Sequence, residues 1–481
     1  MPVNLTAPLS WKKADKDEVA MLQNLQGNIL KGHGRDFTAN IFFKLDPAKK
    51  RESKRMLRKL ANYHLTSAMR QLLDTEEFHA THKDGGPFTH LALSFKGYEA
   101  LGMATSAPTD PDFRDGMKAV ASRSALHDPP VNDWEAHFRG DIHGVVIAAA
   151  TTDSETARLA ASIKELIVDA GGEIVHTQHG RALRNAVGEG IENFGYVDGR
   201  SQPLMLFEDI EREIATAGTS RWDPAFPLST ALVKDPGTTD AVSFGSLFIF
   251  RKLEQAVRGF KTREQEVADV LGLKKDAREL AGAMIVGRFE DGTPVTLSDT
   301  ARGGVPANNF NYQVDPGSRC PFHAHVRKVN PRGSGGAEPE PNERKHLMAR
   351  RGIPFEDVKR ETHPDELPES ESMTEFKAKV QPLLPKSGVG LLFMAYNEKI
   401  AQQFKFTQQT WANNATFPIP GTHGIDPVIG QGTANATDQK LPKAWDDPGA
   451  GTSNNVAFSG FVTMRGGEYM FSPSLTFLMN L

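Results

Sequence analysis

Short apolar runs bounded by turn residues recur along this chain of 481 residues, and they alternate with segments of helical periodicity. The clearest unit lies between residues 143 and 179. An apolar run over His143–Ala149 is followed by a helical segment that Thr152 can cap and that Gly171 ends. An extended run over Glu173–Gln178 comes next. This order predicts strand, helix and strand.

The second half of the chain repeats this alternation. Strands are predicted over Ser243–Arg251 and Gly388–Tyr396, and helices over Thr262–Leu271 and Asp276–Val286. Two further strands of the first half are predicted over Ala39–Leu45 and His90–Phe95. Strands that alternate with helices in both halves predict two α+β units of related architecture.

Two regions lack clear periodicity. Gly218–Thr239 is rich in Pro, Gly, Asp and Thr, and is a candidate domain boundary. We therefore expect one domain over residues 1–225 and a second over residues 226–481. The chain after about residue 411 is rich in Gly, Asn, Thr and Pro, which predicts a coat of loops. Its apolar end, Ser472–Leu481, is predicted to form a final core strand.

Composition excludes several classes of protein. The chain has a net charge of -4, so it lacks the excess of basic residues that is typical of a nucleic-acid-binding protein. One Cys in the whole chain excludes a disulfide framework, Cys-based zinc sites and Cys-ligated iron–sulfur clusters. The apolar runs fall far short of the roughly 18 residues that a membrane span requires. We expect a protein without a membrane or nucleic-acid partner. The N-terminus shows neither a signal-peptide core nor a twin-Arg pair, which predicts a cytoplasmic location, with non-conventional secretion as the alternative.

The first candidate functional motif is an Asp between closely spaced glycines, Gly195-Tyr196-Val197-Asp198-Gly199. The simpler interpretation is a turn, because Asp bonds its own backbone and Gly supplies a positive φ. The functional interpretation is that the glycines bring the backbone close to a flat ligand while Asp198 points at it.

The second candidate motif is Arg319–Arg332, with the sequence RCPFHAHVRKVNPR. His323 and His325 share a face on a strand but diverge on a helix. Each is either a hydrogen-bonded core residue or a ligand. The basic residues, among them Arg327 and Arg332, are either a solvated face or a binding site for carboxylates such as cofactor propionates.

Two further segments have ordinary structural interpretations. Arg350 and Arg351 precede a Gly, as basic residues often do at a helix C-terminus. Gly390–Tyr396 is apolar throughout and is typical of a core strand.

Taken together and in this order, five pieces of the chain resemble the dye-decolourising peroxidases, a family of haem peroxidases. The pieces are LQGNILKGHGR (Leu25–Arg35), FGYVDGRSQP (Phe194–Pro203), CPFHAHVRKVNPR (Cys320–Arg332), RRGIPF (Arg350–Phe355) and GLLFMAYN (Gly390–Asn397). The first piece and the long C-terminal half look most like the larger bacterial and fungal subfamilies. The resemblance implies two ferredoxin-like domains of the dimeric α+β barrel type, with antiparallel sheets and peripheral helices.

The resemblance also implies roles for single residues around one haem b per chain, bound mainly by the C-terminal half. His325 matches the proximal iron ligand, with His323 as a rival two residues earlier. Asp198 matches the distal carboxylate, and Gly195 and Gly199 complete its motif. Asp426, in GIDPVIG, is our hypothesis for the carboxylate that accepts the second N–H of the ligand His.

On the distal side, Arg350 matches the family's arginine, and Arg351 is the fallback. Leu391 and Phe393 are similar to the apolar residues that shape the peroxide pocket. Arg327 and Arg332 are our candidates for binding the haem propionates.

The implied function is a peroxidase that uses hydrogen peroxide to oxidise bulky dyes, phenols and other one-electron donors through a ferryl intermediate. Its partners are hydrogen peroxide and aromatic or dye reductants, and a homo-oligomer is possible. One alternative is a non-catalytic haem-binding or haem-transport protein on the same fold, which needs His325 but neither Asp198 nor Arg350. Another is a haem-free dimeric α+β protein that binds an apolar small molecule.

Overall fold

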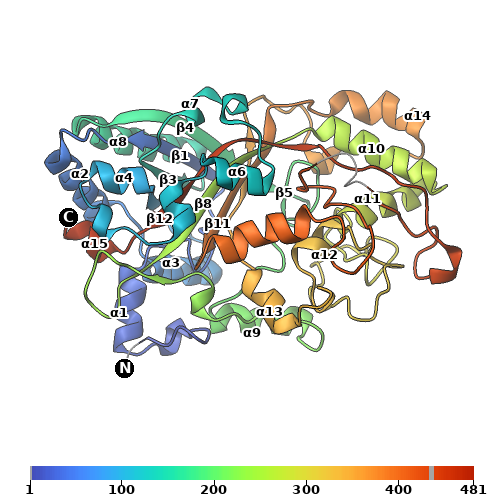
Figure 1. The fold of residues 1–481 in the computed structure, drawn as a ribbon, viewed down its shortest axis with the longest axis horizontal. Helices are drawn as coiled ribbons and strands as arrows, with labels where there is room; N and C mark the ends of the chain where they lie inside the picture. Colours follow the sequence, from blue (N-terminus) through green and yellow to red (C-terminus); the bar gives the residue numbers. More distant parts are fainter. Residues whose placement is uncertain (1–2, 433–437) are drawn as a thin grey trace.

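Antiparallel strands cross the middle of the molecule, and helices cover them at both ends of its long axis (Figure 1). The structure is a computed structural model that describes residues 3–432 and 438–481. In this part of the chain ten strands form one sheet. The strands are β1 (Phe37–Lys44), β2 (Phe88–Leu93), β3 (Gly144–Ala150), β4 (Glu173–Arg181), β7 (Val233–Lys234), β8 (Phe244–Gln255), β9 (Ala349–Arg350), β10 (Ile353–Glu356), β11 (Val389–Asn397) and β12 (Val462–Ser472). A separate hairpin pairs β5 (Leu183–Arg184) with β6 (Gly190–Ile191).

The sheet order shows that the two halves of the chain fold alike. Along its main path the sheet runs β10-β11-β8-β12-β2-β3-β1-β4. In each half the second strand in sequence pairs with the third, the third with the first and the first with the fourth. All these pairs are antiparallel. The halves meet where Phe471 of β12 lies opposite Leu93 of β2. The expected α+β fold with two ferredoxin-like units and antiparallel sheets is therefore confirmed.

The two end strands of the sheet, β4 and β10, also come together, so the sheet curves into a barrel. Gln178 of β4 donates a hydrogen bond from Nε2 to Oδ1 of Asp357, just after β10, at 2.9 Å. Gly180 permits this approach, because a Cβ there would lie 2.7 Å from Cγ2 of Ile353. Side chains close the barrel at this seam, and within residues 3–432 and 438–481 no backbone ladder joins the two strands.

Helices pack outside the strands, and most of those of the two halves gather at opposite ends of the molecule. One exception is α15 of the second half, which packs against α2 of the first (Figure 1). Figure 1 shows α2 and α8 at one end and α10, α11 and α14 at the other. The first half contains α1 (Lys16–Asn24), α2 (Lys50–Tyr63), α3 (Ala68–Thr81), α4 (Phe95–Ala100), α5 (Pro111–Asp115), α6 (Val120–Leu126), α7 (Ala136–Arg139), α8 (Asp153–Asp169) and α9 (Phe207–Ala217). The second contains α10 (Val257–Val270), α11 (Glu279–Val286), α12 (His325–Val329), α13 (Glu340–Glu343), α14 (Met373–Glu375), α15 (Leu475–Met479) and π-helical turns over Ala401–Lys405 and Thr407–Ala412.

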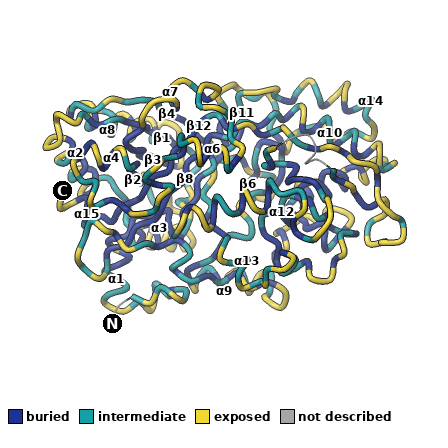
Figure 2. Tube along the Cα trace, in the orientation of Figure 1, coloured by how far each residue is buried: buried dark blue, intermediate teal, exposed yellow. Residues whose placement is uncertain are grey.

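Buried residues form two main apolar clusters (Figure 2). The larger lies on the strands of both halves and includes Ile41, Val146, Phe248 and Tyr396. Because one core spans both halves, they are packed as a single body. The smaller cluster lies around α10 and α11 and includes Phe260. None of the helices in the described ranges combines the length and apolar character needed to cross a membrane.

The C-terminal region differs from its prediction. A loop coat was expected there, but β12 runs through the middle of the sheet between β8 and β2. The predicted final strand over Ser472–Leu481 is wrong. Ser474 caps α15 by accepting a hydrogen bond from the Phe477 N–H at 3.1 Å, and Pro473 cannot donate to a ladder. We propose domains over residues 1–225 and 226–481, and the repeated strand order on either side supports this division.

Candidate active site

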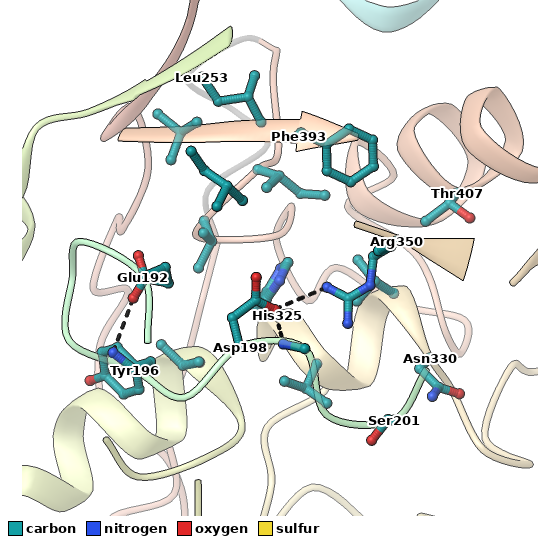
Figure 3. A pocket seen from close by; sticks show the side chains of 18 of the residues that line it. Glu192, Tyr196, Asp198, Ser201, Leu253, His325, Asn330, Arg350, Phe393 and Thr407 are labelled. Carbon is teal, nitrogen blue, oxygen red and sulfur yellow. Dashed lines mark hydrogen bonds and ion pairs between the residues drawn. The ribbon is translucent and has the colours of Figure 1, made fainter. Parts of the chain in front are cut away.

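A pocket lies between the second-half strands and the helices at the far end of the molecule. One wall comes from β8, β11 and β12, and the opposite wall comes from α12 and the end of α11. The segment from Glu192 to Pro203, which contains the Gly-Asp-Gly motif, runs along its rim (Figure 3). Asp198, His325, Arg350, Leu391 and Phe393 all line this one pocket. These five residues, up to 195 positions apart in the sequence, are thus gathered around a single space.

His325 is the first residue of α12, and its ring is oriented by a buried carboxylate. Its Nδ1 lies 2.8 Å from Oδ2 of Asp426. Asp426 is fully buried, and its other oxygen, Oδ1, accepts the backbone N–H groups of Val428 and Ile429 at 2.8 and 2.9 Å. An acceptor of this kind favours a proton on Nδ1, which leaves the lone pair on Nε2. Within the described residues nothing is hydrogen-bonded to Nε2. The ring can therefore ligate a metal through Nε2.

His323, the rival, does not reach the pocket. Its side chain is buried, and burial lowers its pKa to about 3, so it stays neutral. The chain turns into α12 at His325 instead of continuing as a strand, so the two imidazoles do not share a face.

Asp198 and Arg350 form an ion pair at the same pocket. Nη1 of Arg350 lies 3.2 Å from Oδ1 of Asp198, and each side chain is about one-third exposed. Asp198 Oδ1 also accepts the Gly199 N–H at 2.6 Å. The Arg350 backbone N–H donates to Oε1 of Gln202 at 3.0 Å, which ties β9 to the motif segment. The pair is therefore held at a defined place on the pocket and remains accessible to a ligand.

The two motif glycines have different roles. Both need a positive φ, 100° at Gly195 and 84° at Gly199, which shapes the turn that carries Asp198. Gly199 lines the pocket, and a Cβ there would meet no atom within 4 Å. A Cβ at Gly195 would instead face Oε2 of Glu290 at 3.5 Å, away from the pocket. The expectation that both glycines bring the backbone against a ligand therefore holds geometrically for Gly199 only.

Arg350 and the fallback Arg351 point to opposite sides, as neighbours on a strand do. The Arg351 guanidinium donates to the carbonyl oxygens of Asn28 and Ile29 at 2.9 and 3.0 Å. Arg351 is half-buried against first-half residues and does not line the pocket. The geometry therefore places Arg350 alone opposite Asp198.

Arg327 and Arg332, our candidates for propionate binding, do not line the pocket, and this expectation is corrected. Among the described lining residues, Arg332 is hydrogen-bonded only to Ser201, to which its Nη2 donates at 2.6 Å. Arg327 is two positions after His325 on α12, which turns its side chain by about 200°. Its Nη1 pairs with Oδ2 of Asp315 at 3.1 Å and donates to the Cys320 carbonyl at 2.6 Å. Nη1 of Arg332 donates to the Asn308 and Phe310 carbonyls at 2.7 and 2.8 Å. Both guanidinium groups are used to hold the surrounding loops.

Three other arginines line the pocket and were not singled out from the sequence, Arg200, Arg251 and Arg288. Arg251 forms an ion pair with the buried carboxylate of Asp128. Arg200 was inside the quoted motif, two residues after Asp198. Nothing in the local pattern pointed to Arg288, which follows α11. Its Nη2 donates to Oγ of Ser201 at 3.2 Å, and burial lowers its pKa to about 10, so it stays charged at neutral pH.

The corrected placement of Arg327 makes a prediction about stability. Replacing Arg327 by Met leaves the carboxylate of Asp315 buried without its ion-pair partner. We expect the free energy of unfolding to fall by about 3–5 kcal/mol, as for other broken buried pairs. Chemical denaturation measures this change. The folded fraction should keep its full ligand-binding capacity, and a selective loss of ligand from folded protein would restore Arg327 to the site.

Comparison with known proteins decides the family. Residues 24–183 match the family model described as the DyP dimeric alpha+beta barrel domain. The whole chain is 44% identical to the multifunctional dye peroxidase DyP2 of Amycolatopsis sp., with 100% of both chains covered. The chain belongs to the dye-decolourising peroxidase family. The solved structure of that DyP2 superposes on this chain with a TM-score of 0.91. The solved structure of the DyP-type peroxidase of Anabaena sp. is 38% identical and superposes with a TM-score of 0.87, over 98% of this chain and 96% of that one. A curated dye-decolorizing peroxidase of Mycetinis scorodonius is 32% identical over 95% of this chain and 86% of its own.

Dye-decolourising peroxidases are haem enzymes, and the pocket of this peroxidase fits a haem. His325 would ligate the iron through Nε2, and the Asp198–Arg350 pair would supply polar groups for a small molecule in the same pocket. Leu391 and Phe393 of β11 add an apolar wall, and Arg200 and Arg288 are cations suited to two carboxylates. The residues that line the pocket therefore match the group in type.

Proposed function

We propose that this peroxidase reduces hydrogen peroxide at one haem b per chain and takes the electrons from bulky dyes, phenols and other aromatic donors. One observation carries the proposal. His325 and the Asp198–Arg350 pair line the same pocket, so a ligated metal and a proton-transfer pair share one space. When bound, the haem supplies an iron that peroxide oxidises and that two one-electron donors then restore.

His325 would hold the iron through Nε2, and Asp426 would hold His325. The buried Asp426 carboxylate accepts the Nδ1 proton, which makes Nε2 a stronger donor. The backbone N–H groups on its Oδ1 stop Asp426 from rotating away. Arg200 and Arg288 would pair with the haem carboxylates. These contacts would orient the group before peroxide arrives.

Asp198 and Arg350 would have different roles in the reaction with peroxide, proton transfer for Asp198 and charge stabilisation for Arg350. One peroxide oxygen must lose a proton and the other must gain one before the O–O bond breaks and water leaves. The carboxylate of Asp198 accepts the first proton and returns it to the outer oxygen. The guanidinium of Arg350 stabilises the negative charge that grows on the departing oxygen. Their contact of 3.2 Å places acceptor and cation within reach of one small molecule.

The apolar wall formed by Leu391 and Phe393 bears on where bulky electron donors can react. Leu391 and Phe393 line the pocket together with Asp198, and in this proposal their side chains would admit water and peroxide but exclude bulky dyes. Such donors would deliver electrons at the surface through aromatic side chains. A haem carrier, the alternative, would require His325 and Asp426, but no paired carboxylate and guanidinium opposite them.

A visible spectrum taken before and after one equivalent of peroxide tests the proposal, and Asp198→Asn tests its distal half. The variant keeps the shape of the side chain but removes the proton acceptor, so the rate of the peroxide reaction should fall about 100-fold. Stopped-flow absorbance across the pH range measures it. A protein that binds haem but shows no spectral change with peroxide would favour the carrier. Unchanged rates in Asp198→Asn at every pH would remove Asp198 from the reaction.

A further inference from the structure

A second carboxyl group lines the pocket beside Asp198, at the other end of the same segment. Glu192 accepts the backbone N–H of Phe194 on Oε2 at 2.9 Å and that of Tyr196 on Oε1 at 3.0 Å. Its backbone N–H donates to the Tyr196 carbonyl at 3.1 Å, so the segment folds back on this one residue. Figure 3 shows Glu192 and Asp198 on the same loop, with Leu253 above. Glu192 thus shapes the turn that presents Asp198.

Gln255, at the end of β8, joins Glu192 to the sheet wall of the pocket. Its Nε2 donates a hydrogen bond to Oε2 of Glu192. Gln255 lines the pocket and is only 4% exposed. Its Oε1 is buried and has no hydrogen-bond partner among the described residues. One end of this amide is therefore held by Glu192, and the other end has no hydrogen-bond partner among the described residues.

The ionisation of Glu192 determines which end of the amide is left free. An ionised carboxylate only accepts, so it must face the NH2 group, and Oε1 stays free. A protonated carboxyl donates its O–H best to a carbonyl oxygen, so the amide turns over and the NH2 group becomes free. The backbone N–H groups of Phe194 and Tyr196 need acceptors in either state, and the carboxyl retains an acceptor for each.

Glu192 titrates in an accessible range because of its surroundings. Burial raises its pKa to about 7, against the hydrogen bonds it accepts, and the charge of Asp198 on the same segment adds to the rise. The charged group that faces it from another element is Arg360, which follows β10 and donates to the Asn193 side chain at 2.9 Å. Its cation opposes the rise without abolishing it.

We propose that Glu192 and Gln255 form a proton-controlled pair that presents a hydrogen-bond acceptor to the peroxide pocket when Glu192 is ionised and a donor when it is protonated. The pair is a positioning device that acts on peroxide through Gln255, and it rests on the proposed function of the pocket. Breaking the O–O bond builds negative charge on the leaving oxygen, which a donor stabilises and an acceptor does not. The peroxide reaction should therefore be about fivefold faster below pH 7 than above it, the effect of one neutral hydrogen bond.

Infrared difference spectra of the haem-loaded enzyme test the titration without reference to activity. Burial raises the pKa of Glu279 to about 7 as well, so the band of Glu192 is taken as the difference between the wild type and Glu192→Gln. That difference should contain a carboxylic acid C=O band that disappears as the pH rises, with a midpoint near 7, and Asp198→Asn should keep it. Identical titrating bands in the wild type and Glu192→Gln would overturn the inference. Because no turnover is measured, this result stands even if the protein proves to be a haem carrier.

Gln255→Leu separates the titration of Glu192 from its effect on peroxide. The variant keeps the carboxyl but removes both ends of the amide. We expect the infrared band to remain, with its midpoint displaced upward because a hydrogen bond to the carboxylate is lost, and the fivefold step in the rate of the peroxide reaction to vanish. If the step survives in Gln255→Leu, the amide is not the intermediary and the proposal fails. A wild type with no peroxide reaction at any pH would instead refute the proposed function.

Discussion

Replacing Arg350 by Leu should slow the reaction with peroxide by about 10²–10³-fold, the cost of removing one preorganised charge-stabilising donor. The guanidinium lies 3.2 Å from Asp198, and the backbone N–H of Arg350 is anchored to Gln202, so in the proposed reaction it would be held where charge develops. Leu has a similar reach but no positive charge and no donor. Haem binding should be retained, because no proposed ligand is altered. Stopped-flow absorbance at one wavelength of the haem spectrum measures the rate against peroxide concentration.

Arg351 provides a matched control on the neighbouring residue. Its guanidinium donates to Asn28 and Ile29 and not to the pocket. Arg351→Leu should lower stability, since it strands two buried carbonyls, but leave the peroxide rate of the folded enzyme within a few-fold of the wild type. If Arg351→Leu reacted slowly with peroxide while Arg350→Leu reacted at the wild-type rate, Arg351 would have the role proposed for Arg350. That result would show that the two side chains rearrange when haem binds.

Local patterns predicted the elements that can be recognised one at a time. The strand before Thr152, the capped helix after it and the strand beyond Gly171 are all present as β3, α8 and β4. β12 was missed because Arg465, Gly466 and Gly467 interrupt its apolar pattern. There the strand has a bulge between Met464 and Gly466, and Gly466 takes a positive φ of 152°. Its central place in the sheet depends on β8 and β2, which no local pattern reveals.

Some residues of the candidate site could likewise be recognised from local sequence motifs, and others could not. Asp198, His325 and Arg350 stood in motifs long enough to be matched in order, and the structure gathers them around one pocket. Arg327 shared the motif of His325 but points the other way, because the motif is helical there and a match by residue type ignores rotation about a helix axis. Arg288 had no motif at all. It is brought to the pocket by the turn after α11, a tertiary consequence that composition and spacing do not encode.

Replacing His325 by Ala should abolish the Soret band of the wild type or shift it strongly, because the residue proposed to ligate the iron is removed. The expected loss of peroxide activity is of the same order as that of Arg350→Leu or larger. Absorbance and haem content of the purified protein measure the effect. His323→Ala is the matched control, since His323 is buried and does not line the pocket. It should keep the wild-type spectrum even where packing is weakened.

Rescue by imidazole separates loss of the ligand from loss of the fold. His325→Ala removes a ring that lies between Asp426 and the pocket, so free imidazole can occupy its place and donate one N–H to Oδ2 of Asp426. A misfolded variant would not respond, whereas a folded one should regain a haem spectrum close to that of the wild type. The double variant His325→Ala, Asp426→Ala should not be rescued to the same extent, because the acceptor that orients the ring is gone. An unaltered haem spectrum in His325→Ala without imidazole would refute the assignment, since the iron would then have another ligand.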